Sequence, residues 1–169
     1  MKRKKTFQGN GHFGLYAQAM VEFAIALPVL LVLLVGIMEV GRMILTYAMV
    51  VNASRDAVRY ASAVGKGDDG YNKYNNCVGI KNLAQKSAFI VTLSSVTIDY
   101  YDEYGNHLGT CARTAIGEDS SISVDSGYQV KVTVQASYKP VVKLIPIGQK
   151  DFSAASTRTI LGVYSLPNP

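Results

Sequence analysis

The sequence has no tryptophan, only two cysteines and two histidines, and few charged residues for a chain of 169 residues. Charged side chains make up 17% of the chain, whereas an average globular protein has about 25%. Two cysteines and one histidine beyond the N-terminal region cannot supply the four ligands of a structural zinc site without carboxylates at unusual spacing. The eleven tyrosines are not interleaved with basic residues, so they predict packing on sheet faces rather than a stacking platform for nucleic acid. We therefore expect no metal, no cofactor and no nucleic-acid partner.

The net charge is concentrated at the N-terminus. The formal net charge is +5, and the basic cluster at residues 2–5 contributes four of these charges. The 13 other basic residues nearly balance the 12 acidic ones, so the rest of the chain has no excess of positive charge for a nucleic-acid-binding face. The length allows at most one globular domain.

One uninterrupted apolar run, residues 23–38, is the most pronounced feature of the N-terminal region. At about 1.5 Å per residue it would span about 24 Å, a little less than the ~30 Å hydrocarbon core of a bilayer. Residues 19–21 lengthen it, although Glu22 interrupts it. A buried core helix is the alternative, but no other segment is large enough to cover such a helix on all sides. The run therefore predicts a single membrane-spanning helix at about 19–41, with the basic N-terminus in the cytoplasm and the rest of the chain outside.

The helical pattern continues beyond the membrane segment. No small-residue cleavage site follows the run, which passes through the membrane-exit charges Glu39 and Arg42. No proline or glycine occurs from residue 42 to residue 64, so we predict one helix over 18–64 with an amphipathic stalk at 42–64. Pro28 should bend this helix, because proline removes one interior backbone hydrogen bond. The apolar face predicted for the stalk consists of Ile44, Tyr47, Ala48, Val51, Val58 and Ala61.

The remainder predicts a small α+β head. A polar linker at 65–76 precedes the head at 77–169, which begins with a short helix at 77–90. Strands are predicted at 96–101, at 128–138, where every even-numbered residue is apolar, and at 151–161. The head should be an antiparallel sheet of about three to four strands, with one solvated face and the other face packed on the stalk helix or the short helix.

The two cysteines, Cys77 and Cys111, form either one disulfide or two free thiols. The export-type N-terminus favours the disulfide. Such a bond would join the short helix to the loop between the first two predicted strands.

No arrangement of residues in the sequence predicts catalysis, so we expect no enzyme. The head histidine, His107, lies in a predicted turn flanked by glycines, and no serine lies in a nucleophile-elbow pattern. The acidic pairs Asp68-Asp69 and Asp102-Glu103 could contact a cation, but solvated loop carboxylates are the more common interpretation.

Glu22 is the unusual residue of the membrane segment. An ionisable side chain there costs about 2.5–3.5 kcal/mol on insertion scales and is a functional-site hypothesis by default. The alternative is that Glu22 lies at the interface and extends its carboxylate to water. A new α-amine, created by cleavage four residues upstream, would give Glu22 a partner of opposite charge.

Four segments of the chain together form a pattern seen in a known family. They are Ala17–Phe23 with the apolar run that follows, Gly36–Arg42, Asn52–Ala61 and Tyr138–Gly148. In these segments the chain resembles the TadE-like minor pilins (pseudopilins) of the Tad, or Flp-type, tight-adherence pilus system. The resemblance is most specific over its first 45 residues or so and is looser at Tyr138–Gly148.

The resemblance implies that a prepilin peptidase cuts between Ala17 and Gln18 and removes residues 1–17 as a leader. Glu22, the fifth residue of the mature chain, would neutralise the N-terminal amine of a neighbouring subunit. Members of the family usually have glycine before the cut, whereas this chain has Ala17.

The implied function is that of a minor pilin in the assembly of a type IV-like surface pilus. The implied partners are the major pilin, other minor pilins, the pilus secretion ATPase, platform proteins and the prepilin peptidase. The implied location is the cytoplasmic (inner) membrane, with incorporation in an extracellular pilus. The alternative is an uncleaved, signal-anchored envelope protein with an external binding head, and an envelope enzyme has no support in the sequence.

Overall fold

The computed structural model describes residues 12–67, 70–111, 124, 126–142 and 148–161. The chain divides into two compact units, an N-terminal unit of residues 1–40 and a C-terminal unit of residues 41–169. The elements are α1 (His12–Ala61), α2 (Cys77–Ser87), β1 (Leu93–Tyr101), β2 (His107–Thr110), β3 (Gln129–Tyr138) and β4 (Lys150–Thr159). The α+β class, the long apolar helix and the small antiparallel sheet are as the sequence predicts.

In the N-terminal unit, the described residues belong to the first part of α1, and nearly all side chains of residues 17–40 are exposed. Among the described residues, one helix, Ala17–Ala61, is long and apolar enough to cross a membrane. The helix remains unbroken through Pro28, although the carbonyl of Ala24 lacks its usual N–H donor there.

The ends of α1 differ from the predicted range 18–64. The helix begins at His12, inside the segment predicted as a leader, and it ends at Ala61. The end is set by hydrogen bonding, because the N–H of Ala63 bonds to the carbonyl of Tyr60 at 3.2 Å rather than to a carbonyl four residues back. Such i→i−3 bonds tighten the last turn of a helix and close it.

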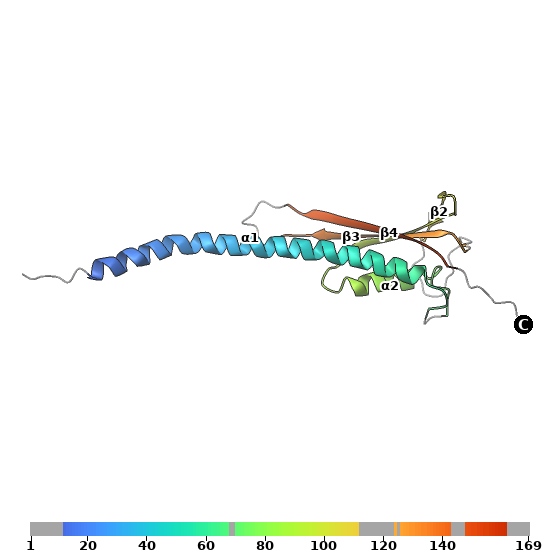
Figure 1. Cartoon of the computed structure of the whole chain (residues 1–169), viewed down its shortest axis with the longest axis horizontal. Helices are drawn as coiled ribbons and strands as arrows, with labels where there is room; N and C mark the ends of the chain where they lie inside the picture. Colours follow the sequence, from blue (N-terminus) through green and yellow to red (C-terminus); the bar gives the residue numbers. More distant parts are fainter. Residues whose placement is uncertain (1–11, 68–69, 112–123, 125, 143–147, 162–169) are drawn as a thin grey trace, which may run out of the picture. The chain divides into compact units, whose positions relative to one another are not determined.

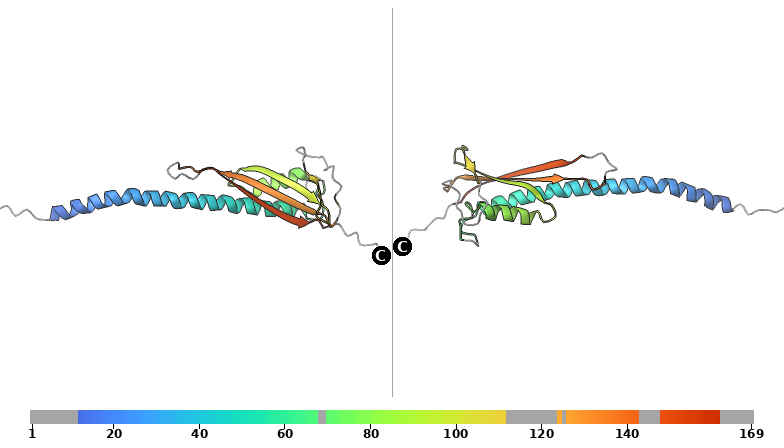
Figure 2. Two further views of the ribbon diagram at one scale, coloured as in Figure 1. Left: turned by 90° about the horizontal axis from the view of Figure 1, so that it is seen from above. Right: turned by 180° about the vertical axis from the view of Figure 1, so that it is seen from behind.

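In the C-terminal unit, a four-stranded antiparallel sheet has the order β2-β1-β3-β4. Three of its strands were predicted, whereas β2 was not. The hairpin between β1 and β2 turns at Gly105, whose φ of 86° suits glycine. Residues 41–61 of α1 and all of α2 cover the same face of this sheet (Figures 1 and 2).

The strand β3 supplies the centre of the core. Its even-numbered residues are all buried, and Val132 pairs with Ile98 of β1 while Val130 pairs with Tyr100. These side chains point toward the helices because successive residues of a strand alternate between the two faces. The odd-numbered residues of β4 on the other face are exposed, as expected for a sheet with one solvated face.

The face of α1 that packs on the sheet agrees with the predicted one only toward the end of the helix, where Val58 and Ala61 are buried. Ile44 and Tyr47 remain 61% and 51% exposed, because the buried stripe is rotated toward smaller residues. One of these is Ser54, whose hydroxyl lies 3.0 Å from that of Ser156 in β4. Small side chains allow the helix to approach the sheet closely. The buried residues of this stripe are Val50, Ala53, Ser54, Ala57, Val58 and Ala61.

The helix α2 is three residues shorter than predicted. Its N-terminus is capped by Asn76, whose side-chain oxygen accepts a hydrogen bond from the N–H of Gly79 at 2.7 Å. The helix ends at Ser87, and a turn in which Val91 donates to the carbonyl of Ala88 leads toward β1.

Candidate functional site

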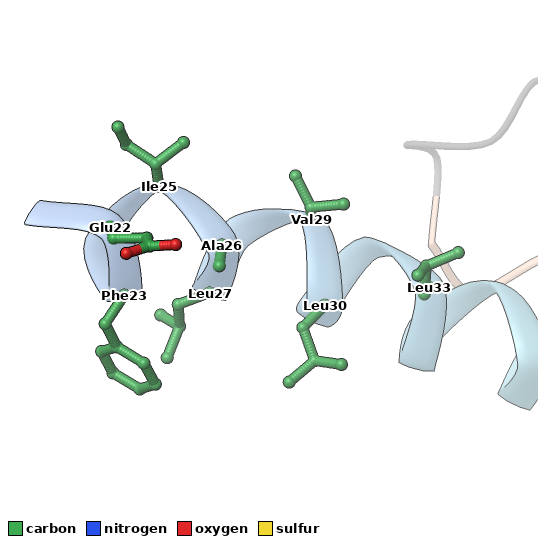
Figure 3. A pocket seen from close by; sticks show the side chains of 8 residues that line it. All are labelled: Glu22, Phe23, Ile25, Ala26, Leu27, Val29, Leu30 and Leu33. Carbon is green, nitrogen blue, oxygen red and sulfur yellow. The ribbon is translucent and has the colours of Figure 1, made fainter. Parts of the chain in front are cut away.

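Glu22 lies in the exposed apolar part of α1, beside a hollow formed by side chains of this one helix. Figure 3 shows Ile25 and Val29 on one side of the hollow and Phe23, Leu27 and Leu30 on the other. Apart from the Glu22 carboxylate, every side chain that lines it is apolar. The hollow is open, because a single helix cannot enclose a cavity.

The Glu22 carboxylate has no hydrogen-bond or ion-pair partner within the part of the chain that the structure describes. The nearest residue one turn further along the same face is Ala26, since residues four apart on a helix lie above one another. Its methyl group is small and leaves the carboxylate accessible from the side. In hydrocarbon, a carboxylate in this setting is stable only with a cationic partner.

The predicted processing residues Ala17 and Gln18 are both exposed on α1. Gln18 precedes Glu22 by four residues, so the two positions share one face of the helix. The bond between Ala17 and Gln18 lies within the continuous helix.

The two predicted membrane-exit charges have different surroundings. Glu39 is only 3% exposed, which the sequence did not predict. Arg42, in the C-terminal unit, lies with its guanidinium carbon 5.7 Å from the centre of the Tyr138 ring, a distance typical of a cation–π contact. Among the described residues, every buried side-chain nitrogen or oxygen has a hydrogen-bond partner.

A disulfide joins Cys77 to Cys111 across 6.0 Å between their Cα atoms. Cys77 is the first residue of α2, and Cys111 directly follows β2. The bond therefore joins α2 to the segment between β1 and β3, the first two strands that the sequence predicts. It attaches α2 to the end of a strand, because the N–H of Cys111 bonds to the carbonyl of Ile98 at 2.7 Å.

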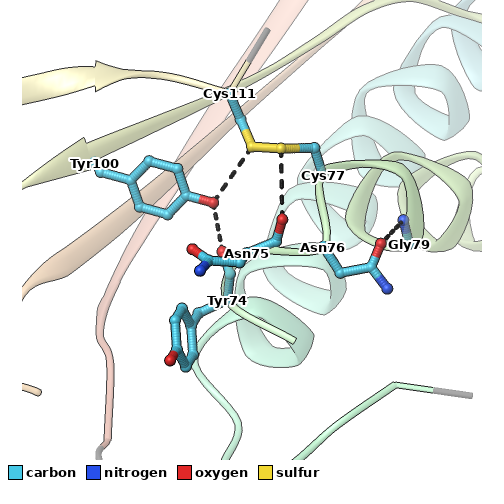
Figure 4. The surroundings of a disulfide bond; sticks show 7 residues. All are labelled: Tyr74, Asn75, Asn76, Cys77, Gly79, Tyr100 and Cys111. Atoms are coloured by element: carbon cyan, nitrogen blue, oxygen red, sulfur yellow. Dashed lines mark hydrogen bonds between the residues drawn. A yellow bond between two sulfur atoms is a disulfide. The ribbon is translucent and has the colours of Figure 1, made fainter. Parts of the chain in front are cut away.

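A buried tyrosine supports this disulfide (Figure 4). The Tyr100 hydroxyl donates to the carbonyl of Tyr74, and its oxygen lies 3.5 Å from Sγ of Cys111. Burial raises the pKa of Tyr100 well above its ordinary value, so the hydroxyl keeps its proton and its role as donor. The sulfur of Cys77 lies 3.7 Å from the carbonyl of Asn75, which is a contact only, since a disulfide sulfur has no proton. The sequence did not predict that Tyr100 contacts the disulfide, although its position in an alternating strand is visible in the sequence.

The histidine of the head lies in β2 rather than in a turn. Its Nε2 is 3.5 Å from Oδ1 of Asp99, and its ring meets the ring of Tyr101 edge-on. Thr110 also donates to Asp99 and not to the imidazole. The cluster of His107, Asp99 and Thr110 therefore lacks the hydrogen bond between nucleophile and base that acyl-transfer chemistry requires.

The carboxylate of Asp102 is used within its own turn. It accepts hydrogen bonds from the side chain and N–H of Asn106 and from the N–H of Tyr104. The Asn106 side chain is the main reason why the pKa of Asp102 is lowered. Asp68 and Asp69 lie outside the described residues. In the described ranges, no group of three or more metal-binding side chains occurs.

The comparisons with known proteins concern the N-terminal helix. The family model of the TadE-like proteins matches residues 17–59, a range that contains Glu22, Pro28 and Arg42. No curated protein and no solved structure matches the chain. The match agrees with the resemblance found in the sequence, which is to pilin-like proteins associated with the Tad pilus. Over residues 17–59, α1 is therefore similar to the TadE-like proteins.

Proposed function

We propose that the chain is a minor pilin-like subunit that takes part in assembling a Tad-type surface pilus. The observation that carries the proposal is the Glu22 carboxylate. It lies on an exposed apolar helix surface, without a partner among the described residues, and within the range that the TadE-like family model matches. The apolar part of α1 anchors the chain in the membrane, and the C-terminal unit lies outside the cytoplasm.

A prepilin peptidase cuts between Ala17 and Gln18 on the cytoplasmic side and creates an α-amine at Gln18. As helices of neighbouring subunits bundle, Glu22 of one subunit pairs with the amine of another. Two opposite charges in a low-dielectric environment stabilise each other, whereas removing one member of a buried pair typically costs about 3–5 kcal/mol. The pairing therefore admits processed chains to the filament and excludes unprocessed ones.

Assembly requires further components of the same system. The helix surface packs against the major pilin and other minor pilins, and the platform proteins and secretion ATPase move subunits from the membrane into the filament. The C-terminal unit contributes no catalytic step to this proposal.

The processing step is tested by the intact mass and N-terminal sequence of the protein recovered from native membranes. We expect a chain that begins at Gln18. Ala17→Gly should be cut at the same bond, whereas Ala17→Leu should retain residues 1–17, because a large side chain replaces the small one before the cut. A wild-type chain that keeps its basic leader would contradict the proposal and favour an uncleaved, signal-anchored protein with an external binding head.

The pairing is tested by Glu22→Ala, measured as the fraction of protein in filaments sheared from the cell surface. We expect normal membrane insertion and loss of filament incorporation. Glu103→Ala, which removes an exposed carboxylate of the β1–β2 turn, is the matched control and should assemble normally. Incorporation of the Glu22 variant at the wild-type level would rule out the charge pairing.

A further inference from the structure

A groove of about 400 Å³ lies between α1 and β4 within the C-terminal unit. Its polar lining comes from Arg55 and Arg59 of α1 and from Ser156, Thr157 and Arg158 of β4. Among the described residues that line it, Asp56 is the one carboxylate. The groove takes no part in the function proposed for Glu22.

The three arginines of the groove have unused hydrogen-bonding capacity. Arg55, Arg59 and Arg158 are all exposed, and none of their guanidinium groups has a hydrogen-bond or ion-pair partner among the described residues. Arg55 and Arg59 are four residues apart and lie on the same side of the helix. The guanidinium group is suited to bidentate pairing with carboxylate or phosphate.

The second feature of the groove is the open edge of β4. This strand is outermost in the sheet, and no described residue pairs with its outer side. Ile160 donates its N–H to the carbonyl of Tyr128 at 2.7 Å. This bond shows that the even-numbered residues of β4 direct their backbone hydrogen bonds toward β3. Because hydrogen-bonded pairs alternate in antiparallel strands, the odd-numbered residues of β4 turn their N–H and C=O groups outward. These residues are Asp151, Ser153, Ala155, Thr157 and Thr159.

Within the described part of the chain, the middle of β4 lacks the usual protection of an edge strand. Residues 152–157 carry no charge and no proline, and the strand is ten residues long. Natural proteins normally shorten, charge or cover such edges, because an open edge pairs with other strands.

We propose that this groove binds an extended acidic segment of a partner protein, which adds to β4 as a further strand of the sheet. Strand addition satisfies the outward backbone groups of β4, and the arginines pair with carboxylates of the added segment. Alternate residues of a strand are about 6.8 Å apart, close to the axial spacing of about 6 Å between Arg55 and Arg59. The recognised segment therefore carries acidic residues at alternate positions.

The position of the groove along α1 argues against a lipid headgroup as the ligand. Arg55 lies fourteen residues beyond Gly41, where the predicted membrane segment ends, which corresponds to about 21 Å along the helix. The headgroup layer on one side of a bilayer is about 5–8 Å thick. A free anion would engage the arginines but would leave the edge of β4 unpaired.

The test uses the full chain in detergent micelles and a fluorescein-labelled nine-residue peptide of alternating valine and glutamate. We expect binding by fluorescence anisotropy and slower amide exchange in β4. Arg55→Gln and Arg59→Gln should each weaken binding about tenfold, as expected for a charged hydrogen bond. Lys86→Gln, an equal change of charge on the exposed surface of α2, should leave binding unchanged, and unaltered amide exchange in β1 and β3 would show that the variants remain folded.

Two control peptides separate charge from strand addition. A peptide with glutamine in place of glutamate, and one with N-methyl groups at alternate residues, should both bind much more weakly. Equal binding of either peptide, or no binding of the glutamate peptide up to about 1 mM, would overturn the proposal. Displacement by inorganic phosphate or phosphatidylglycerol vesicles, without any slowing of exchange in β4, would assign the groove to anions or lipids instead. Slow exchange in β4 that depends on protein concentration alone would assign it to a second copy of the chain.

Discussion

Residues 17–38 of α1 expose large aliphatic side chains, whereas residues 50–61 bury small ones. Leu30 and Ile37 are examples from the first part, and Ala53 and Ala57 from the second. Both parts are helical. The second part has a sheet to pack against, and small residues bring the two backbones together. The first part has no such partner among the described residues, and its apolar surface remains available to lipid and to other helices.

The largest expected difference is between two isoleucine truncations, one in each unit. Ile98→Ala leaves a cavity in the core of the C-terminal unit, where Ile98 is fully buried, and should lower the free energy of unfolding by about 2–5 kcal/mol. Ile37→Ala removes a side chain that is 71% exposed and should have almost no effect. Denaturation of the full chain in micelles measures both variants when it is followed by tyrosine fluorescence for the C-terminal unit, since all tyrosines except Tyr16 lie beyond residue 46, and by circular dichroism for α1. Equal losses for the two variants would contradict the comparison.

Reduction of the disulfide should have the next largest effect. Cys77 and Cys111 are 34 residues apart, and opening a loop of this length typically costs about 2–4 kcal/mol of stability. Dithiothreitol should therefore lower the melting temperature of the C-terminal unit, and the double variant Cys77→Ser/Cys111→Ser should match the reduced protein. The helicity of residues 12–40 should not change, and a parallel loss there would show that the two units unfold together.

The smallest expected effect concerns the turn at Asp102. Its pKa is lowered from the ordinary value of 3.8, mainly by the Asn106 side chain. A carboxyl group whose pKa is lower in the folded state than in the unfolded state stabilises the fold at a pH above the unfolded-state pKa. This stability is lost as the pH falls through the folded-state pKa. We expect the side-chain carbon of Asp102 to titrate below pH 3.8 in an NMR experiment. Asn106→Ala should bring the titration back toward the ordinary value, whereas an unchanged midpoint would show that Asn106 does not matter.

Sequence reasoning succeeded where the signal was periodic and local. The alternation in β3 predicted the strand and its buried face, because every second side chain of a strand points the same way. It missed β2, since a strand of four residues with a glycine at Gly109 has no alternation to detect. The predicted face of α1 was right at Val58 and Ala61 but wrong at Ile44 and Tyr47, whose large side chains suggested a core that smaller residues in fact form.

The sequence by itself determined the apolar segment with Glu22, the leader-like charge at the N-terminus and the two cysteines. These features are local, and the free energy of an apolar run in lipid depends on its own composition. Only the tertiary structure decided that Tyr100 supports the disulfide and that Arg59 and Arg158 line one groove. The two arginines are about a hundred residues apart in the chain, and they share a groove only because α1 packs beside β4. Contacts of this kind depend on the packing of whole elements, which no local pattern encodes.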